Sequence, residues 1–184
     1  MPMPDAIRPQ RVVVMGPEST GKTTLARLLA RHFGVACVPE EARLFYEEAG
    51  HAHYVYEDEA LITERHVQRV AQTERLARDT GQPFLVLDTD VLTIGFWSQH
   101  YFGRQPPNLQ AAIAGWQAEL YLLLATDRPW QPDSQRDRPH SRHSFLQQQQ
   151  ALLRQRGATY RLITGDWPAR FRQATEAIDE TLLR

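Results

Sequence analysis

The sequence predicts an α/β domain built on a five-stranded parallel sheet with helices on both faces. Short apolar runs, partly β-branched, alternate five times with longer segments of helical periodicity. The run FLVLD at 84–88 is apolar up to its last residue, which is typical of a strand covered on both faces. The first run, RVVVMG at 11–16, leads through a glycine-bearing turn into a helix. Strands that alternate with helices in this way favour a parallel sheet between two helical layers.

The first three strands and the helices between them come from the first half of the chain. Leu25, Leu28, Leu29 and Phe33 recur at helical spacing, and Gly34 suits the end of that helix. Residues 57–79 contain neither glycine nor proline and are rich in good helix formers, so one long helix is expected there. The elements expected in this half are strands at 11–16, 35–39 and 84–88 and helices at 22–33, 40–48 and 57–79.

The second half contributes two further strands. ELYLLLATD at 119–127 has a continuous apolar middle, and YRLIT at 160–164 is a shorter run. The PPN at 106–108 separates two helical segments, and leucines flank the glutamine run of a third. The elements expected in this half are helices at 90–102, 109–118, 145–155 and 167–183 and strands at 119–127 and 160–164, with a long polar loop at 128–142.

Composition and charge restrict the classes of partner. The 184 residues suit one domain with a full core, and the net charge of −1 gives no general attraction for nucleic acid or a membrane surface. The single cysteine, Cys37, excludes an internal disulfide and a cysteine-based zinc cluster. We expect a flexible arm at 1–10, without the features of a signal peptide, and one cytoplasmic domain over 11–184 with no nucleic acid and no membrane partner.

A glycine-bearing loop between the first strand and the first helix carries the strongest functional signal. GPESTGKT at 16–23 fits the pattern G-x-x-x-x-G-K-[ST] at each fixed position. In this pattern the glycines bring backbone N–H groups close to phosphate oxygens, and the Thr23 hydroxyl is offered to Mg²⁺. The sequence therefore predicts that the loop binds a nucleoside triphosphate with Mg²⁺. The residues expected to bind it are Gly16, Glu18, Ser19, Thr20, Gly21, Lys22, Thr23 and Thr24.

Lys22 is the only lysine in a chain whose lysines and arginines together number 21. A compact ammonium can reach between the β- and γ-phosphates inside a tight loop, whereas the wide planar guanidinium of arginine has a different reach. This requirement explains why one lysine persists among so many arginines, and it makes Lys22 a predicted catalytic residue.

Two aspartates stand at the end of the strand predicted at 84–88. Ligands of parallel sheets gather beyond the carboxyl ends of the strands, which is where Asp88 is expected. Its carboxylate could hold the metal through water or accept a proton from an attacking hydroxyl, or it could serve only as a turn residue. Asp90 could contact the substrate, or it could cap the helix that begins beside it.

An arginine-rich segment precedes the helix predicted at 145–155. In small enzymes with the same loop a lid closes at this point, and lid arginines neutralise charge on a transferred phosphoryl group while water is excluded. We therefore expect a lid at about 127–142, although its arginines could also reflect composition alone. The arginines of the segment are Arg128, Arg136, Arg138 and Arg142, of which Arg138 and Arg142 are the predicted catalytic ones.

A second group of side chains is expected at the same edge of the sheet. Glu40, Glu41 and Arg43 follow the second predicted strand. Either carboxylate could bind or deprotonate an acceptor hydroxyl there, or could only place negative charge on the first turn of a helix. Aromatic residues gather at 45–56 and 96–102. Most of them suit the core, and Trp97 is the first candidate for stacking on a flat ring.

The loop TGDW at 164–167 follows the last predicted strand. In folds of this kind the loop at this place often forms a wall for the adenine. Asp166 and Trp167 are therefore expected near the nucleotide, although Asp166 could instead cap the last helix.

These segments, in this order, resemble the kinase domain of NadR-type ribosylnicotinamide kinases. The resemblance rests on GPESTGKTTLA, VPEEAR, LDTDVLTIGFWSQHYFG and the later ATDRPW and RDRPHSR, and it covers roughly residues 11–165. It implies a three-layer P-loop kinase fold with an arginine-rich lid. It also implies transfer of the γ-phosphoryl group of ATP, with Mg²⁺, to the 5′-hydroxyl of nicotinamide riboside, which gives nicotinamide mononucleotide for NAD synthesis. Matching motif positions are held by Lys22, Thr23, Glu40, Arg43 and Asp88.

The substrate implied by the resemblance is a small nucleoside with a positively charged pyridinium ring. Such a ring favours aromatic faces and nearby carboxylates, which is compatible with Tyr46, Trp97, Glu40 and Asp90 as substrate-binding residues. Fused family members carry further domains upstream, and neither adenylyl transfer nor repression is expected from this chain. The alternatives are a kinase for another nucleoside, a nucleotide or a cofactor precursor, and a P-loop ATPase that acts as a regulatory switch.

Overall fold

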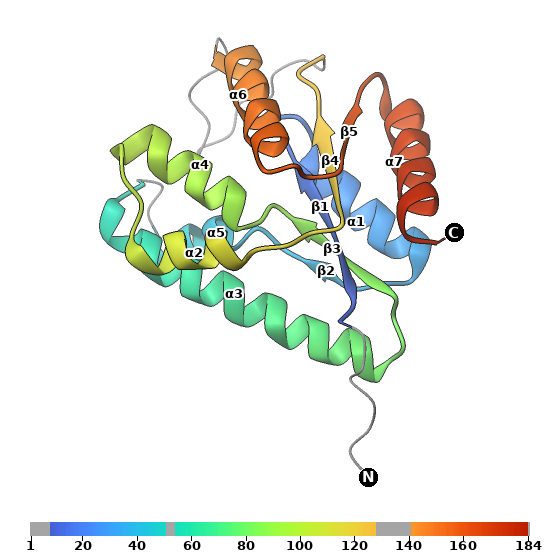
Figure 1. Cartoon of the computed structure of the whole chain (residues 1–184), viewed down its shortest axis with the longest axis horizontal. Helices are drawn as coiled ribbons and strands as arrows, with labels where there is room; N and C mark the ends of the chain where they lie inside the picture. Colours follow the sequence, from blue (N-terminus) through green and yellow to red (C-terminus); the bar gives the residue numbers. More distant parts are fainter. Residues whose placement is uncertain (1–7, 51–53, 128–140, 184) are drawn as a thin grey trace.

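Within the residues that the computed structural model describes, 8–50, 54–127 and 141–183, five parallel strands form the middle layer (Figure 1). Their order across the sheet is β2-β3-β1-β4-β5, so β1 lies at the centre. The predicted α/β class with a parallel sheet is confirmed. The strands are β1 (Gln10–Met15), β2 (Cys37–Val38), β3 (Phe84–Asp88), β4 (Leu120–Leu124) and β5 (Tyr160–Ile163).

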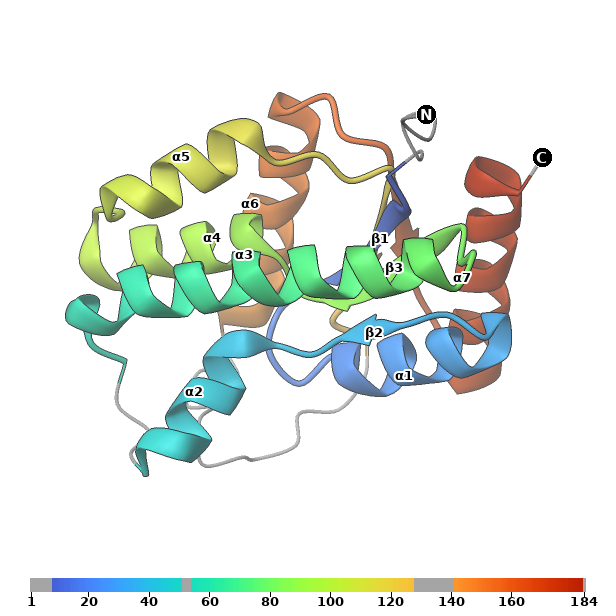
Figure 2. The same ribbon diagram turned by 90° about the horizontal axis from the view of Figure 1, so that it is seen from below.

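Helices cover both faces of the sheet, as Figures 1 and 2 show. One face carries α1 (Lys22–Phe33) and α7 (Trp167–Leu182). The short α2 (Glu41–Ala49) packs on α3 (Tyr56–Asp79). No helix in the described ranges is both long and apolar enough to cross a bilayer. The layer on the other face consists of α3 (Tyr56–Asp79), α4 (Val91–Phe102), α5 (Pro107–Gly115) and α6 (Arg142–Gln155).

Strand residues alternate between two hydrophobic cores, one on each side of the sheet. Val13 and Met15 of β1 belong to the core under α3 and its neighbours, whereas Val12 and Val14 belong to the core under α1 and α7. All four side chains are fully buried. A strand covered on both faces has no polar side, and this is why the sequence shows a continuous apolar run there.

Several helix and strand bounds differ from the sequence prediction, and the strand expected at 35–39 is reduced to Cys37–Val38. The helix expected at 109–118 begins at Pro107, because a proline in the first turn of a helix lacks only an N–H that would have no helical partner. The helix expected at 145–155 begins at Arg142, and β4 ends at Leu124 rather than at 127.

The structure contradicts the arm predicted at 1–10 only at its described residues, 8–10. Arg8 donates a hydrogen bond of 2.6 Å to a carboxylate oxygen of Glu119, and Gln10 is already the first residue of β1. Residues 1–7 lie outside the described residues, and so do residues 128–140, which hold most of the expected lid.

The order of the strands brings two distant turns together at one edge of the sheet. β1 and β3 are parallel neighbours, and Val14 lies opposite Asp88 in their register. The Thr89 N–H donates to the carbonyl of Val14 at 3.1 Å, which fixes the two strand ends side by side. The loop that follows β1 and the carboxylate that ends β3 therefore meet at the carboxyl edge, where parallel sheets bind ligands.

Candidate functional site

The loop at 16–23 adopts a backbone path that few side chains could follow. Gly16 has φ of 153° and Gly21 has φ of 90°, while Ser19 has φ of 57° despite its side chain. A Cβ atom at Gly16 would lie 3.0 Å from the carbonyl oxygen of Leu124, at the end of β4. Both glycines are therefore required, because the loop turns sharply and lies directly on the neighbouring strand.

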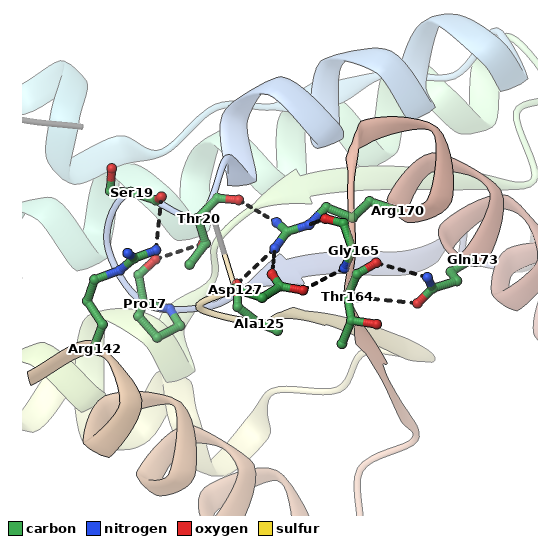
Figure 3. Close-up of polar contacts among 10 residues, drawn as sticks. All are labelled: Pro17, Ser19, Thr20, Ala125, Asp127, Arg142, Thr164, Gly165, Arg170 and Gln173. Atoms are coloured by element: carbon green, nitrogen blue, oxygen red, sulfur yellow. Dashed lines mark hydrogen bonds and ion pairs between the residues drawn. The ribbon is translucent and has the colours of Figure 1, made fainter. Parts of the chain in front are cut away.

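Hydrogen bonds hold the carbonyl groups of this loop from several directions. The Pro17 carbonyl accepts from the Thr20 hydroxyl at 2.8 Å and from Lys22 Nζ at 3.1 Å. The Ser19 carbonyl accepts from Arg142 at 3.2 Å, as Figure 3 shows. In a planar trans peptide the next N–H points away from the carbonyl, so N–H groups of the loop are directed elsewhere and can meet an anion.

Asp88 is a buried carboxylate at the end of β3. Its side chain is 2% exposed, and its Oδ1 has no hydrogen-bond partner among the described residues. Burial and the nearby Glu40 raise the pKa of Asp88 from its ordinary value to about 6, while the Thr23 hydroxyl, Lys22 and Arg43 act in the opposite direction. The structure therefore places Asp88 beside Thr23 and Lys22.

Thr23 and Asp88 fit a magnesium site of the kind that takes few ligands from the protein. Mg²⁺ prefers oxygen ligands and commonly binds one or two carboxylates together with phosphates and water. Oδ1 of Asp88, which has no hydrogen-bond partner within the described ranges, is a buried oxygen with acceptor capacity. Among the described residues no group of three or more His, Cys, Asp or Glu side chains could hold a metal ion, so a fully protein-made site is not found there.

A pocket joins this loop to the region after β2. It encloses about 60 Å³, so a nucleoside would enter only if side chains of the lining moved apart. The loop contributes Glu18 and Lys22, and four of the five residues predicted to bind substrate also line the pocket. The full lining is Glu18, Lys22, Glu40, Ala42, Arg43, Tyr46, Tyr54, Trp97 and Tyr101.

Aromatic rings form one side of the pocket. Tyr101 stacks between Tyr54 and Trp97, with ring centroids 5.2 and 5.7 Å apart and an angle of 27° in each pair. The ring centroids of Tyr46 and Tyr54 lie 4.9 Å apart. Trp97 and Tyr46 are only 8% and 3% exposed, so the rings that line the pocket also belong to the packed interior. The sequence does not distinguish Tyr54 and Tyr101 from the aromatic residues around them.

Asp90 is the one predicted substrate-binding residue that the structure separates from the pocket. Its side chain is fully buried and accepts from the backbone N–H of Thr93 at 3.1 Å, which makes it the N-cap of α4. Its other carboxylate oxygen accepts from the hydroxyl of Tyr121 at 2.8 Å. Both oxygens are thus used within the protein, and the helix-cap alternative describes Asp90 in this structure.

The neighbouring carboxylates of Glu40 and Glu41 point to different surroundings. Glu40 lines the pocket and lies 3.8 Å from the guanidinium of Arg43. Glu41 is fully buried against α3, where Arg65 donates to it at 2.8 Å and Arg69 at 2.5 Å. Glu41 therefore fixes the start of α2 on α3, and this leaves Glu40 and Arg43 facing the pocket.

We expect Glu41→Gln to lower the free energy of unfolding by about 3 kcal/mol, because a buried carboxylate that pairs two arginines is lost. Urea denaturation followed by circular dichroism measures the change. The matched control is Glu48→Gln, since Glu48 also pairs with Arg65 but its side chain is 62% exposed. The control is expected to cost less than about 1 kcal/mol. Equal losses in the two variants would contradict the role given to Glu41.

The start of α7 packs against the loop at 16–23. Asp166 accepts from the N–H of Ala169 at 2.9 Å and caps α7, as its cap alternative predicts. The Trp167 ring lies against Gly21, since a Cβ atom built on Gly21 would be 2.5 Å from that ring. Of these two residues, Trp167 is the one in contact with the loop.

The two arginines predicted to be catalytic have different outcomes. Arg142 is the first residue of α6, is 7% exposed, and donates to the loop carbonyl of Ser19. Arg138 lies outside the described residues. Thr24 is exposed on α1, beside the loop rather than within it.

Sequence reasoning missed one arginine at this site. Arg170 of α7 is fully buried and donates to the Thr20 carbonyl at 2.7 Å, to the Ala125 carbonyl at 3.0 Å, and to a carboxylate oxygen of Asp127 (Figure 3). Burial opposes ionisation of Asp127, but the Gly165 N–H and Arg170 outweigh it and lower the pKa of that carboxyl. No local pattern separates Arg170 from the other arginines, because its partners come from distant segments.

Comparison with known proteins gives one family and a few relatives. A family model described as AAA domain matches residues 11–170. The Trifunctional NAD biosynthesis/regulator protein NadR of Escherichia coli (strain K12) is 27% identical over 189 residues, an alignment that covers 98% of this chain and 45% of NadR. The chain thus spans about half the length of the curated relatives it matches.

Solved structures share the fold at low identity. A NadR protein in complex with NR has a TM-score of 0.77 and 24% identity; the alignment covers 95% of this chain and 51% of the NadR chain. A deoxyadenosine kinase from M. mycoides with bound dATP has a TM-score of 0.56 and 8% identity, over 92% of this chain and 99% of its own. These likenesses support the P-loop kinase fold. Because the family model covers most of the chain and includes the loop at 16–23, the chain belongs to the AAA domain family.

Proposed function

We propose that the chain is an ATP-dependent kinase that phosphorylates the 5′-hydroxyl of nicotinamide riboside and produces nicotinamide mononucleotide. The observation that carries the proposal is the pocket that joins the phosphate-binding loop to Glu40, Arg43 and a set of aromatic rings. Lys22 belongs to the loop and also lines the pocket. A phosphate donor on the loop and an acceptor in the pocket would therefore meet beside its ammonium group. Phosphoryl transfer depends mainly on such positioning and on charge stabilisation.

The relatives support the choice of acceptor. NadR of Escherichia coli is named for NAD biosynthesis, and a NadR protein has been solved in complex with NR, the usual abbreviation of nicotinamide riboside. The pyridinium ring of this nucleoside is positively charged. The faces of Trp97 and Tyr46 and the carboxylate of Glu40 are the groups of the pocket that suit a flat cation.

In the proposed mechanism the loop holds the triphosphate through its N–H groups, and the Lys22 ammonium contacts the β- and γ-phosphates. Thr23 and Asp88 would hold Mg²⁺, which supplies charge neutralisation on the phosphate oxygens. Arg142, already beside the loop, would add positive charge where the phosphoryl group is transferred. Trp167, against Gly21, would border the nucleotide.

The two carboxylates of the site would have separate tasks. Asp88 lies beside Thr23 and Lys22, which favours a role for Asp88 as a ligand of Mg²⁺. Glu40 lines the acceptor pocket, which favours a hydrogen bond to the acceptor hydroxyl and removal of its proton. We extend the proposal to residues 11–184 as one kinase domain, with Arg138 in a lid at about 127–142 that excludes water.

The proposal is tested by ADP release in the presence of Mg·ATP, with and without nicotinamide riboside. We expect the nucleoside to raise the rate at least about a hundredfold over hydrolysis, because the acceptor replaces a poorly positioned water. A product with the mass of nicotinamide mononucleotide should accumulate in step with ADP.

The outcome separates the proposal from its alternatives. Stimulation by a different nucleoside, but not by nicotinamide riboside, would retain the kinase and reject the acceptor; the fold shared with a deoxyadenosine kinase makes purine nucleosides the first controls. Slow hydrolysis that no acceptor stimulates would instead favour a P-loop ATPase that acts as a regulatory switch.

A further inference from the structure

The buried guanidinium of Arg170 joins the phosphate-binding loop to two other segments, the one after β4 and the one between β5 and α7. Its side chain is fully buried. It donates to the Thr20 carbonyl at 2.7 Å in the loop and to the Ala125 carbonyl at 3.0 Å beyond β4. It also donates to the Gly165 carbonyl at 2.9 Å, between β5 and α7, and it pairs with Asp127. Three main-chain oxygens and one carboxylate thus converge on one side chain (Figure 3).

The bond to the Thr20 carbonyl has a direct consequence for the loop. A trans peptide is planar, and its carbonyl and the following N–H point in opposite directions. When Arg170 draws the Thr20 carbonyl toward the protein interior, the N–H of Gly21 is turned the other way. Gly21 immediately precedes Lys22, so the same peptide fixes the start of α1 and the origin of the lysine side chain.

We infer that Arg170 is a positioning residue for the phosphate-binding loop: it fixes the Thr20–Gly21 peptide so that the Gly21 N–H and Lys22 are aimed at the nucleotide phosphates. The inference rests on the proposed function only in that the loop binds Mg·ATP. It assigns Arg170 no contact with substrate. A guanidinium is needed because its fixed fork can satisfy several acceptors at once, whereas an ammonium at the end of a flexible chain cannot reproduce that geometry.

The rest of the network shows why the interaction is more than a stabilising contact. Asp127 accepts from the Gly165 N–H at 2.5 Å as well as from Arg170, so the β5–α7 turn is fixed to the same point. Two residues beyond Gly165, the Trp167 ring lies against Gly21. A displacement of this turn would therefore move both the peptide bond before Gly21 and the ring that packs on it.

The experiment compares Arg170→Lys with a matched control, Arg172→Lys. Arg172 lies on the same helix, but its side chain is 67% exposed and its ion pair with Glu176 spans 3.9 Å. We expect Arg170→Lys to weaken Mg·ATP binding, measured by calorimetry, at least about tenfold, as for loss of a hydrogen bond to a charged group. The KM for the acceptor nucleoside should stay within about twofold, and the control should match the wild type in both measurements.

A merely structural role would lower the unfolding temperature and leave the dissociation constant of Mg·ATP unchanged at a temperature where the variant is folded; that result would overturn the inference. Asp127→Asn is the second variant, because it keeps the size of the side chain and removes the charge that holds Arg170. It should weaken Mg·ATP binding by a smaller factor, of about threefold. If Arg170→Lys does not fold, wild-type affinity in Asp127→Asn overturns the inference.

The readout separates this inference from the proposed function. Wild-type protein that binds Mg·ATP but does not phosphorylate nicotinamide riboside contradicts the proposed acceptor and leaves the role of Arg170 testable by calorimetry. Wild-type protein that phosphorylates nicotinamide riboside, together with unchanged ATP affinity in both variants, contradicts only the role of Arg170.

Discussion

Lys22→Ala is expected to lower kcat for phosphoryl transfer by at least about a hundredfold, the scale of losing one preorganised donor from an enzyme site. Lys22→Arg is expected to lose nearly as much, although it keeps the positive charge. The Lys22 Nζ lies 3.1 Å from the Pro17 carbonyl, within the turn of the loop. A guanidinium on this path is too wide and too flat to reach the same point. Initial rates with saturating Mg·ATP and acceptor measure both variants.

The control for this prediction is Arg31→Lys, which introduces a lysine on an exposed position near the end of α1. Its kcat should match the wild type, because the substitution keeps the charge and touches no part of the site. Near-normal turnover in Lys22→Arg would show that only the charge of residue 22 matters. Near-normal turnover in Lys22→Ala would remove the loop from the mechanism altogether.

Asp88→Asn is expected to reduce kcat at least about a hundredfold, because an amide is a far weaker ligand for Mg²⁺ than a carboxylate. Its fold should be retained, because ionised Asp88 is a buried charge whose Oδ1 has no hydrogen-bond partner among the described residues. The matched control is Asp90→Ala. That variant loses the cap of α4 and the acceptor of the buried Tyr121 hydroxyl, so it should be less stable by about 2–3 kcal/mol, with little change in kcat.

The same carboxyl gives the wild type a pH dependence with a defined sign. The pKa of Asp88 is raised to about 6, mainly by burial, so the proton competes with Mg²⁺ below that value. Activity at limiting Mg²⁺ should therefore fall as the pH is lowered through about 6, and added Mg²⁺ should move the midpoint to lower pH. An activity profile that is flat across this range would contradict the assignment of Asp88 to the metal.

The raised pKa also predicts a stability effect. Because the folded protein binds the Asp88 proton more tightly than the unfolded chain does, stability from this group is fully present below the unfolded pKa and is lost as the pH rises through about 6. Asp88→Asn should thus unfold at a higher temperature than the wild type near neutral pH, and the difference should shrink in acid. Differential scanning calorimetry of both proteins at neutral and at acidic pH measures the difference in unfolding temperature.

Features that depend on local pattern could be predicted from the sequence. The strand, loop and helix around GPESTGKT follow from an apolar run, two glycines and a helical period, all within residues 11–33. The parallel sheet follows from the alternation of such units. The cap on α4 is local too, since Asp90 bonds to a residue three positions away, but the sequence could not decide between cap and substrate contact.

Features that depend on distant segments could not be predicted. Arg170 bonds to Thr20 across 150 positions of sequence, and nothing near it marks it among 20 arginines (21 lysines and arginines less the one lysine). Glu40 and Glu41 are adjacent and chemically alike, yet only the arrangement of α2 against α3 sends one to the pocket and the other to two arginines. The stacking of Tyr101 between Tyr54 and Trp97 likewise requires the segment before α3 to meet α4.

The contact between Trp167 and Gly21 restricts how this protein can be redesigned or diverge. Gly21 has φ of 90°, and any Cβ there would lie 2.5 Å from the indole, so a substitution at 21 meets two independent obstacles. Shrinking the indole removes only one of them, since the left-handed backbone still excludes most side chains. Mutational libraries that vary position 167 alone can reshape the proposed nucleotide wall, whereas libraries at position 21 are expected to return glycine whatever stands at 167.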